Sequence, residues 1–458
     1  MTNINRRNFI KLGLSALAAS GCLSLQRQLF AEVLTQKDAK KRKTFNDYKA
    51  LVCIYLAGGC DGFNLLLPAD GVAYDEYYKV RQGMALAKDQ IISLNPATSQ
   101  GFDIGIHYKL PGVKSLFESQ KLALFANIGN LIQPITRQEF LNNSVPVPDQ
   151  LFSHNSQEDQ WQILSKETRG NPGWGGRMID LTDSSSSVPA GINLSGYNPW
   201  ILGKTTSPYK LKSSGIVTYY GMDNVNSTTD MKRKELFTKM MDKSQFEHPF
   251  QKSYIDLHNN SMAIAKKIGD AFNNLSPITT TIPTGNSFAE SLMSVAKMIA
   301  AQPELNMKRQ VFFVRAGGYD THDSQLTSME TLFKTLDDGI TMFQNALNEY
   351  GIADRTISFT ASEFGRTLTG NGDGTDHGWG SHLFAFGNPV KGGEIFGTMP
   401  ILEVNGQNDS RNGRLIPTLS ADQYASSIAE WFGFNESERL SLFPNLVNFT
   451  NKTIPFIN

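Results

Sequence analysis

Short apolar segments that end at glycines constrain the fold of this chain most strongly. Residues 50–57 read Ala-Leu-Val-Cys-Ile-Tyr-Leu-Ala and stop at Gly58 and Gly59. A continuous apolar run of this length is typical of a strand that is buried on both faces of a parallel sheet. We expect further strands of this type at residues 122–128, 311–314, 356–360 and 383–386.

Helical patterns lie between several of these strands. Residues 113–119 form one, and residues 329–350 form another with apolar side chains on a single face. Strands that alternate with helices predict an α/β domain with a central, mostly parallel sheet flanked by helices. We place this domain at residues 47–458 and treat residues 197–285, which break the alternation, as a variable insertion.

The first residues predict export. Arg6 and Arg7 precede Asn-Phe-Ile-Lys and an uncharged apolar stretch over residues 12–25, which is too short for a comfortable membrane span. We interpret residues 1–31 as a twin-arginine signal peptide and residues 32–46 as a linker. The predicted location is the periplasm, either free or lipid-anchored through Cys22.

Composition and charge exclude some classes of function. The 43 basic and 43 acidic residues cancel, and no basic block suggests binding to nucleic acid. No apolar run after the signal peptide is long enough to form a transmembrane helix. Cys53 and Cys60 are separated by seven residues of extended chain, which is more than a disulfide can bridge.

Polar residues follow the predicted strands, where ligand groups gather in open α/β sheets. Asp61 follows the first strand on a glycine turn, and it can hold a metal or only bond its own backbone. Asp320 and His322 follow the strand at residues 311–314. A carboxylate with an imidazole suits zinc, manganese or iron, although the pair can also be a helix cap and a surface histidine.

The next strand is followed by Glu363 and Arg366, and the loop after it holds Asp376 and His377. Arg366 can receive a phosphate or sulfate oxyanion through its planar fork, or form an ion pair that holds a loop. We therefore predict a site for a divalent metal, with zinc as the expected ion, made by Asp61, Asp320, His322, Glu363 and His377.

Helix starts and loops supply the other candidates. Ser153 lies at a predicted helix start, where it is either an N-cap or a nucleophile that the helix dipole activates. We assign catalytic roles to Ser153 and Arg366. Substrate contacts are assigned to four residues: Asn64, His107, His154 and Asp376.

Several motifs resemble those of the exported family called domain of unknown function 1501. They are the Arg-Arg leader, residues 56–64, Ser153-His154 with Asp159 and Trp161, residues 173–177, residues 317–322, residues 362–367, residues 374–378 and residues 413–417. They run in the family's order over nearly the whole mature chain. The family looks like a distant branch of the alkaline phosphatase and sulfatase superfamily.

That resemblance implies a metal cluster at the carboxyl ends of the strands, usually of two zinc or related ions. Asp61 would match the first acidic ligand, Asp320 and His322 the middle pair, and His377 the late histidine. The superfamily usually has an Asp-His pair where this chain has Ser362 and Glu363.

These features lead to two hypotheses. The first is an exported, metal-dependent hydrolase of phosphate or sulfate esters, carried by small molecules or polymers. The alternative is a non-catalytic periplasmic binding or assembly protein that retains the fold. The resemblance also implies an exported partner from the family called domain of unknown function 1800.

Overall fold

The computed structural model describes residues 42–166, 170–216 and 227–458. The predicted signal peptide, Cys22 and most of the predicted linker lie outside these residues. The end of the linker contacts the domain. Lys43 pairs with Thr182 in an isolated parallel bridge, and its ammonium lies 2.8 Å from the carboxylate of Glu438.

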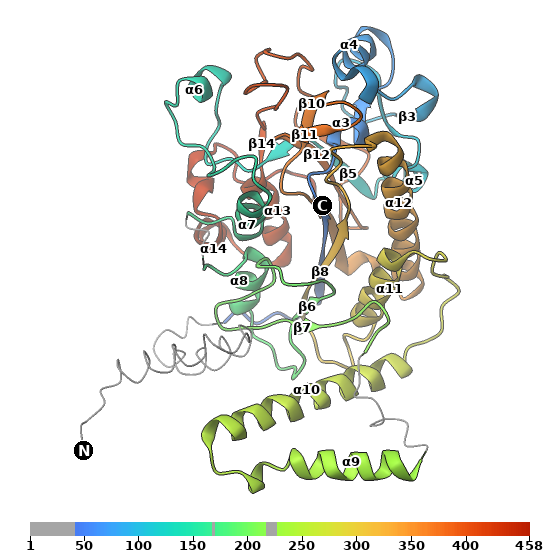
Figure 1. The fold of residues 1–458 in the computed structure, drawn as a ribbon, viewed down its shortest axis with the longest axis vertical. Coiled ribbons are helices and arrows are strands. Elements are labelled where there is room, and N and C mark those ends of the chain that lie inside the picture. The colour runs from blue at the N-terminus through green and yellow to red at the C-terminus, as the bar shows by residue number, and fades with distance from the viewer. Residues whose placement is uncertain (1–41, 167–169, 217–226) are drawn as a thin grey trace, which may run out of the picture.

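A nine-stranded sheet forms the centre of the molecule (Figure 1). Eight of its strands follow the order β13-β5-β12-β9-β1-β8-β6-β7, and β14 also pairs with β5. Their bounds are β1 Lys49–Ala57, β5 Leu122–Gly129, β6 Gly191–Asn193, β7 Tyr209–Lys210, β8 Arg309–Gly317, β9 Thr356–Ala361, β12 Ser381–Phe386, β13 Ile395–Phe396 and β14 Leu419–Ser420.

Strand direction explains how residues from distant parts of the chain reach one edge. Strand β1 runs parallel to β8 and β9, whereas β12 runs antiparallel to both of its neighbours, β5 and β9. The carboxyl ends of β1, β8 and β9 therefore lie beside the amino end of β12. Residues that follow three strands meet residues that precede a fourth.

The predicted α/β class is confirmed, with a mixed, mostly parallel sheet between helices. Each of the five predicted strands is present within a few residues of its expected bounds. Strand β1 is buried along nearly its whole length, because it has neighbours on both sides and helices on both faces. The sequence pattern gave no indication that β12 runs against the others.

Helices cover the sheet on two sides (Figure 1). One side carries α5, α11 and α12, and the other carries α7, α8, α13 and α14. The predicted apolar face of α12 is buried, including Leu336, Ile340 and Phe343. These helices span α5 Pro111–Glu118, α7 His154–Ile163, α8 Trp174–Asp180, α11 Ser287–Ala300, α12 Gln325–Glu349, α13 Ala421–Phe432 and α14 Glu436–Leu442.

Two smaller sheets lie apart from the central sheet. An antiparallel pair joins β10 to β11, and a three-stranded sheet has the order β2-β4-β3. Two helices, α3 and α4, lie beside these strands, and α6 lies in the loop before α7. The bounds are α3 Gly62–Leu65, β2 Leu66–Pro68, α4 Gly71–Arg81, β3 Ile91–Leu94, β4 Ile104–His107, α6 Arg137–Leu141, β10 Arg366–Gly370 and β11 Thr375–His377.

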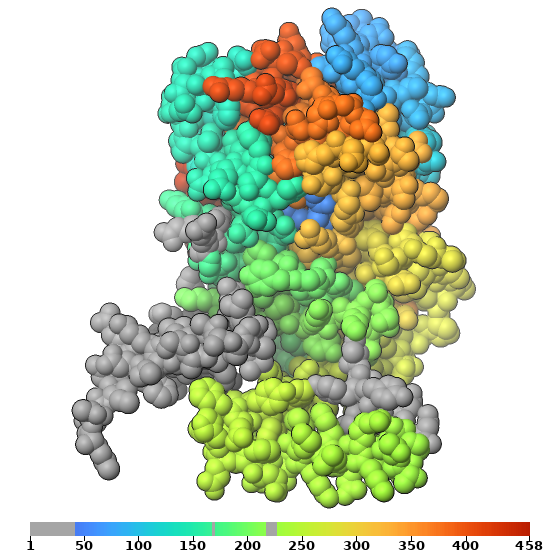
Figure 2. All heavy atoms as spheres, in the orientation of Figure 1, coloured from blue at the N-terminus to red at the C-terminus, as the bar shows by residue number. Residues whose placement is uncertain are grey.

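The predicted insertion contains a helical hairpin made by α9 (Thr228–Met240) and α10 (Pro249–Asn273). Both helices project from the body of the molecule (Figures 1 and 2). Helix α9 has no buried residue, whereas α10 buries Ile264 and Ile268 against the main core. The hairpin is therefore attached mainly through the second half of α10.

The two cysteines of the described chain, Cys53 and Cys60, are free and buried, as the sequence spacing predicted. Within the described ranges, no helix has both the length and the apolar character needed to cross a membrane. Stability therefore depends on the large apolar core around the sheet rather than on covalent cross-links.

Candidate functional site

The carboxyl edge of the sheet gathers polar residues from three strand ends. Ala57 at the end of β1 pairs with Gly317 at the end of β8. Gly58 has a φ of +122°, and a Cβ there would lie 2.2 Å from the backbone nitrogen of Asp320. Only glycine allows the two loops to approach so closely, so the turn after β1 helps to position Asp320.

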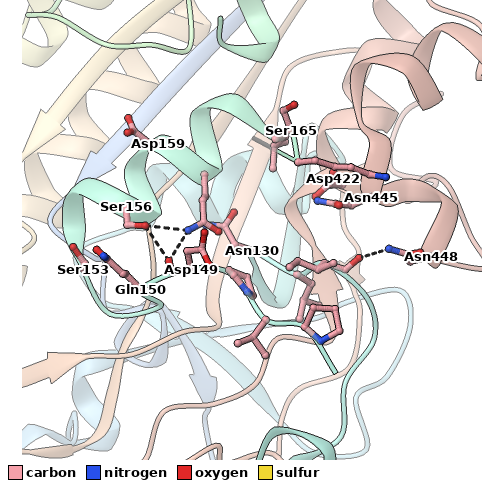
Figure 3. A pocket seen from close by; sticks show the side chains of 18 of the residues that line it. Asn130, Asp149, Gln150, Ser153, Ser156, Asp159, Ser165, Asp422, Asn445 and Asn448 are labelled. Carbon is pink, nitrogen blue, oxygen red and sulfur yellow. Dashed lines mark hydrogen bonds between the residues drawn. The ribbon is translucent and has the colours of Figure 1, made fainter. Parts of the chain in front are cut away.

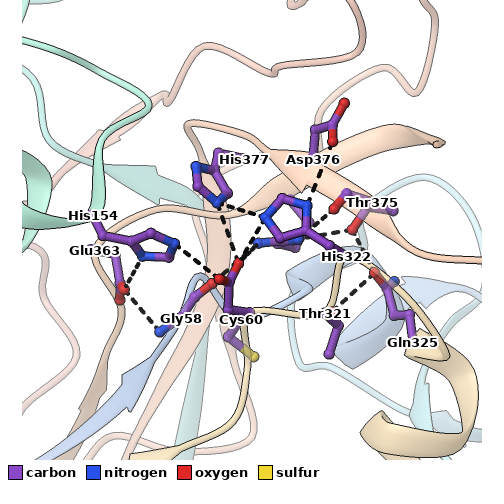
Figure 4. Close-up of polar contacts among 12 residues, drawn as sticks. Gly58, Cys60, His154, Thr321, His322, Gln325, Glu363, Thr375, Asp376 and His377 are labelled. Carbon is purple, nitrogen blue, oxygen red and sulfur yellow. Dashed lines mark hydrogen bonds and ion pairs between the residues drawn. The ribbon is translucent and has the colours of Figure 1, made fainter.

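Asp320 is the centre of a cluster with three histidines, His154, His322 and His377, which are labelled in Figure 4. Its Oδ1 lies 3.1 Å from Nε2 of His322 and 3.3 Å from Nε2 of His377, and its Oδ2 lies 3.4 Å from Nε2 of His154. Ligand atoms of His154, Asp320 and His377 all lie within 4.8 Å of one another. These residues come from α7, the loop after β8, and β11.

The outer ring nitrogens of the histidines face acceptor oxygens. Nδ1 of His154 lies 2.9 Å from Oε1 of Glu363, and Nδ1 of His377 lies 2.8 Å from the carbonyl oxygen of Phe152. A carboxylate or carbonyl oxygen can only accept, so each Nδ1 carries a proton. When these two rings are neutral, their Nε2 lone pairs point toward Asp320, as metal-binding histidines require.

One atom of the cluster has no hydrogen-bond partner. Nε2 of His154 is buried, yet the described protein atoms offer it no hydrogen bond. It faces Asp320 Oδ2 across 3.4 Å, a charged acceptor that a neutral lone pair cannot bond. A cation between the two groups would satisfy both, and the nitrogen-rich donor set suits zinc best among common protein metals.

Arg366 holds Asp320 from inside the protein. Its guanidinium is fully buried and donates from Nη1 to Asp320 Oδ1 at 2.8 Å and to the carbonyl of Gly58 at 3.2 Å. Its Nε donates to Thr375 Oγ1 at 3.1 Å, and its Nη2 donates to the carbonyl of Thr375. The guanidinium is thus engaged mainly with protein acceptors rather than presented to the cleft.

The surroundings shift the ionisation of the cluster. Burial opposes ionisation of Asp320, but the hydrogen bond from Arg366 and the nearby positive charges lower the pKa of its carboxyl below the ordinary value. The hydrogen bond to Glu363 raises the pKa of His154. Burial lowers the pKa of His377, which favours its neutral, ligand-ready form.

Glu363, a predicted metal ligand, lies behind His154. Its carboxylate is buried, and its Oε1 accepts from the backbone N–H of Gly58 at 2.8 Å as well as facing His154 Nδ1. The geometry places Glu363 in the orienting position and His154 in the position that faces Asp320. The sequence pattern had assigned Glu363 to the metal and His154 to the substrate.

Asp61, another predicted ligand, lies outside the cluster. It is fully buried, forms an ion pair with Arg81, and accepts from Gln325 Nε2 at 2.6 Å and from the backbone N–H of Phe63 at 3.2 Å. Gln325 accepts in turn from Thr375 Oγ1. Asp61 therefore supports the cluster through a buried hydrogen-bond network, because its carboxylate is already occupied by protein donors.

Two predicted substrate contacts are also turned into the protein. Asn64 is buried, donates to the carbonyl of Met84 at 2.9 Å and accepts from the hydroxyl of Tyr77 at 2.7 Å. His107 is buried between Tyr108 and Phe333, and burial lowers its pKa to about 4. The structure gives both side chains packing roles.

Asp376 and Ser153 remain accessible. Asp376 is half exposed, accepts from Asn371 at 2.7 Å and lies 3.6 Å from Nδ1 of His322. Ser153 is the N-cap residue of α7, as predicted, but its side chain makes no capping hydrogen bond. It directly precedes His154 and lines a neighbouring cavity (Figure 3).

The structure also adds residues that the sequence did not indicate. Arg81, Gln325 and Thr375 form the network beneath the cluster, and the carbonyl of Phe152 orients His377. Arg81 is the last residue of α4, and nothing in its local sequence distinguishes it. Such contacts depend on the tertiary fold alone.

The sheet, its flanking helices and the histidine–aspartate group at its edge define an α/β protein with a cluster that can hold a metal ion. A family model described as a protein of unknown function, DUF1501, matches residues 48–425. The chain belongs to this family, which confirms the family expected from the motifs. No curated protein matches the sequence.

Solved structures give weaker similarities. Ps i-CgsB matches with a TM-score of 0.37 and 11% identity, over 88% of this chain and 77% of that chain. The lipoteichoic acid synthase LtaP from Listeria monocytogenes gives 0.35 and 8%, over 89% and 77%. BT1596, a 2-O GAG sulfatase, gives 0.29 and 10%, over 86% and 74%. With TM-scores below 0.5, these similarities carry no argument about function.

Proposed function

We propose that the protein is an exported, metal-dependent hydrolase of phosphate or sulfate esters. The observation that carries this proposal is the cluster in which Nε2 atoms of His154, His322 and His377 face the Asp320 carboxylate. These four residues would hold the ion. A bound divalent metal supplies a Lewis acid that polarises an ester oxygen and lowers the pKa of an attacking hydroxyl or water.

The other residues of the site would prepare these ligands. Glu363 keeps the proton of His154 on Nδ1, and the Phe152 carbonyl does the same for His377, so that both Nε2 atoms stay free to coordinate. Arg366 fixes the Asp320 carboxylate and keeps it ionised. We therefore assign Arg366 a positioning role rather than contact with the substrate.

Ser153 is our candidate for the attacking group. Its hydroxyl is not used as a helix cap, it lies at the N-terminus of the ten-residue helix α7, and the next residue belongs to the cluster. A helix N-terminus stabilises negative charge on such an oxygen. Water is the competing nucleophile, and a Ser153→Ala variant separates the two.

Metal analysis of protein purified from the periplasm tests the proposal. Wild type should contain a divalent metal, and Asp320→Ala and His322→Ala variants should lose it. His258→Ala serves as a matched control, because this histidine lies on α10 in the projecting hairpin. Turnover of p-nitrophenyl phosphate or p-nitrophenyl sulfate by wild type would then identify the ester. Metal in all variants alike would contradict the proposed ligands.

The projecting hairpin favours the second hypothesis, a binding or assembly protein. Met231, Leu236 and Met240 on α9 are more than half exposed, as is Phe250 on α10. Exposed apolar side chains of this kind are typical of interaction surfaces. A wild-type protein that binds no metal and hydrolyses neither ester would favour this role, with an exported partner such as a member of the 1800 family.

We also propose that the twin-arginine leader directs export to the periplasm, with Cys22 as the residue that would carry a lipid anchor. A chain with Arg6→Lys and Arg7→Lys substitutions should accumulate in the cytoplasm. Equal periplasmic amounts of this variant and wild type would contradict the proposed route.

A further inference from the structure

Residues 413–417, one of the family motifs, form a loop beside the histidine cluster. Two backbone hydrogen bonds hold this loop in place. The N–H of Leu368 in β10 donates to it at 2.9 Å, and the N–H of Gly380, which follows β11, donates to it at 2.8 Å. The loop therefore carries Arg414 to the side of the cluster that His377 occupies.

Arg414 contacts two residues that shape the cluster. Its Nε donates to the carbonyl oxygen of His377 at 2.9 Å, and its Cζ lies 4.2 Å from the centroid of the Phe152 ring. The carbonyl of Phe152 in turn accepts from Nδ1 of His377, and Ser153 is the next residue in the chain. The guanidinium thus touches both a proposed metal ligand and the segment that holds the proposed nucleophile.

The terminal nitrogens of Arg414 are available for a ligand. The side chain is half-buried, and within the described ranges no protein acceptor bonds its Nη1 or Nη2. Two other arginines near the site differ. Arg366 is engaged with protein acceptors through all three nitrogens, and Arg315 forms an ion pair with Glu158 at 3.2 Å. A guanidinium with two spare terminal nitrogens can bind two oxygens of a phosphate or sulfate group.

The side of the cluster formed by His322 carries negative charge. Three exposed carboxylates lie there, those of Asp323, Asp373 and Asp376, and Oδ1 of Asp376 is 3.6 Å from Nδ1 of His322 (Figure 4). Like charges repel, so an anionic group at the cluster is driven away from these carboxylates. Its charged oxygens would instead face the Arg414 side.

We propose that Arg414 is the residue that binds the phosphate or sulfate oxygens of the substrate. The inference rests on the proposed function, because it takes the cluster as the place where the ester is held. The sequence pattern had offered Arg366 for contact with an oxyanion, but that guanidinium is buried and holds Asp320. Arg414 supplies a cation at the same cluster with donors that the protein does not use.

Binding of inorganic phosphate and of sulfate tests the inference without requiring turnover. Both anions are titrated by calorimetry into the mature protein, once loaded with zinc and once free of metal. Wild type should bind at least one of them, and Arg414→Ala should weaken that binding about tenfold or more, because charge-assisted hydrogen bonds are lost. Arg411→Ala is the matched control, since it removes an exposed arginine three residues away, and it should leave the affinity unchanged.

Two further variants separate the charge of Arg414 from its support of His377. Arg414→Gln keeps an amide that can donate to the His377 carbonyl but has no charge, whereas Arg414→Lys keeps the charge. The glutamine variant should bind the anion as weakly as the alanine variant. The lysine variant should recover part of the affinity, and both should hold as much zinc as wild type.

Several results would overturn the inference. It is wrong if wild type binds neither anion, if Arg414→Ala binds as tightly as wild type, or if Arg414→Gln restores binding. Loss of zinc together with anion binding would also overturn it, because Arg414 would then act only through His377. Anion binding that depends on Arg414, in a protein that takes up no zinc or hydrolyses neither ester, would count against the proposed function alone.

Discussion

Two aspartates at neighbouring strand ends have similar local sequences but different surroundings. Asp61 follows β1 in Gly-Gly-Cys-Asp, and Asp320 follows β8 in Gly-Gly-Tyr-Asp. Asp61 is fully buried and ion-paired with Arg81, whereas Asp320 is 45% exposed and faces three imidazoles. A shared turn can bring a carboxylate to the sheet edge, but the tertiary partners decide whether it supports the structure or is free to bind a ligand.

The largest difference between the two aspartates should appear in stability. Asp61→Ala leaves the buried charge of Arg81 without its partner and should lower the free energy of unfolding by about 3–5 kcal/mol. Asp320→Ala also removes a partner of the buried Arg366, but it should cost less than Asp61→Ala, because Asp320 is 45% exposed and water can replace its carboxylate. Urea denaturation of both variants measures the difference. Adding Arg81→Leu to Asp61→Ala should restore part of the lost stability.

Asp422 extends the comparison to a buried carboxylate that forms no ion pair among the described residues. Burial raises its pKa to about 7, so the folded state binds its proton more tightly than the unfolded state does. Its contribution therefore destabilises the fold increasingly as pH rises from about 4 to about 7, by up to about 4 kcal/mol. Asp422→Asn should gain stability relative to wild type across this range. Urea midpoints at each pH that shift in parallel for both proteins would contradict the assignment.

A Glu363 variant tests whether the hydrogen bond that orients His154 contributes to metal affinity. Glu363→Gln removes the charge that holds the proton of His154 on Nδ1, and metal affinity should fall about 10–100-fold. Asp376→Asn is the matched control, since this exposed carboxylate lies 3.6 Å from His322, and its effect should be smaller than about tenfold. Competition with a chelator measures both affinities. If Glu363→Gln and Asp376→Asn lost the same amount of metal affinity, the buried position of Glu363 would not explain its effect.

The smallest effect should be the pH dependence of metal affinity. Protons compete with the ion for Nε2, and the hydrogen bond to Glu363 raises the pKa of His154. Affinity should therefore fall as pH falls, and the fall should begin at a higher pH than for an ordinary imidazole. A decrease of about tenfold per pH unit is expected for each imidazole that must lose a proton. The same titration of Glu363→Gln should move the loss to lower pH. An affinity that is independent of pH would exclude histidine ligands.

The sequence predicted the strands and the class of fold because each buried strand is apolar over its whole length. Strand β1 and the apolar face of α12 are local patterns that do not depend on distant residues. The direction of β12 could not be predicted from such a pattern, since an apolar run is the same in either direction. That direction nevertheless brings His377 to the sheet edge.

The candidate site was predictable in part. Asp320, His322 and His377 lie together because glycine-flanked polar residues next to buried strands meet at one edge. Asp61 has the same local pattern, and its different placement depends on Arg81 and Gln325, which approach only in the folded chain. The position of His154 also depends on a long-range contact, its hydrogen bond to Glu363.

Anomalous diffraction from crystals of the mature protein grown with zinc tests the central claim most directly. The account predicts a strong anomalous peak about 2.0–2.2 Å from the Asp320 carboxylate and from Nε2 of His154, His322 and His377. A peak bonded to Asp61 instead, or no peak at the carboxyl edge of the sheet, would contradict it.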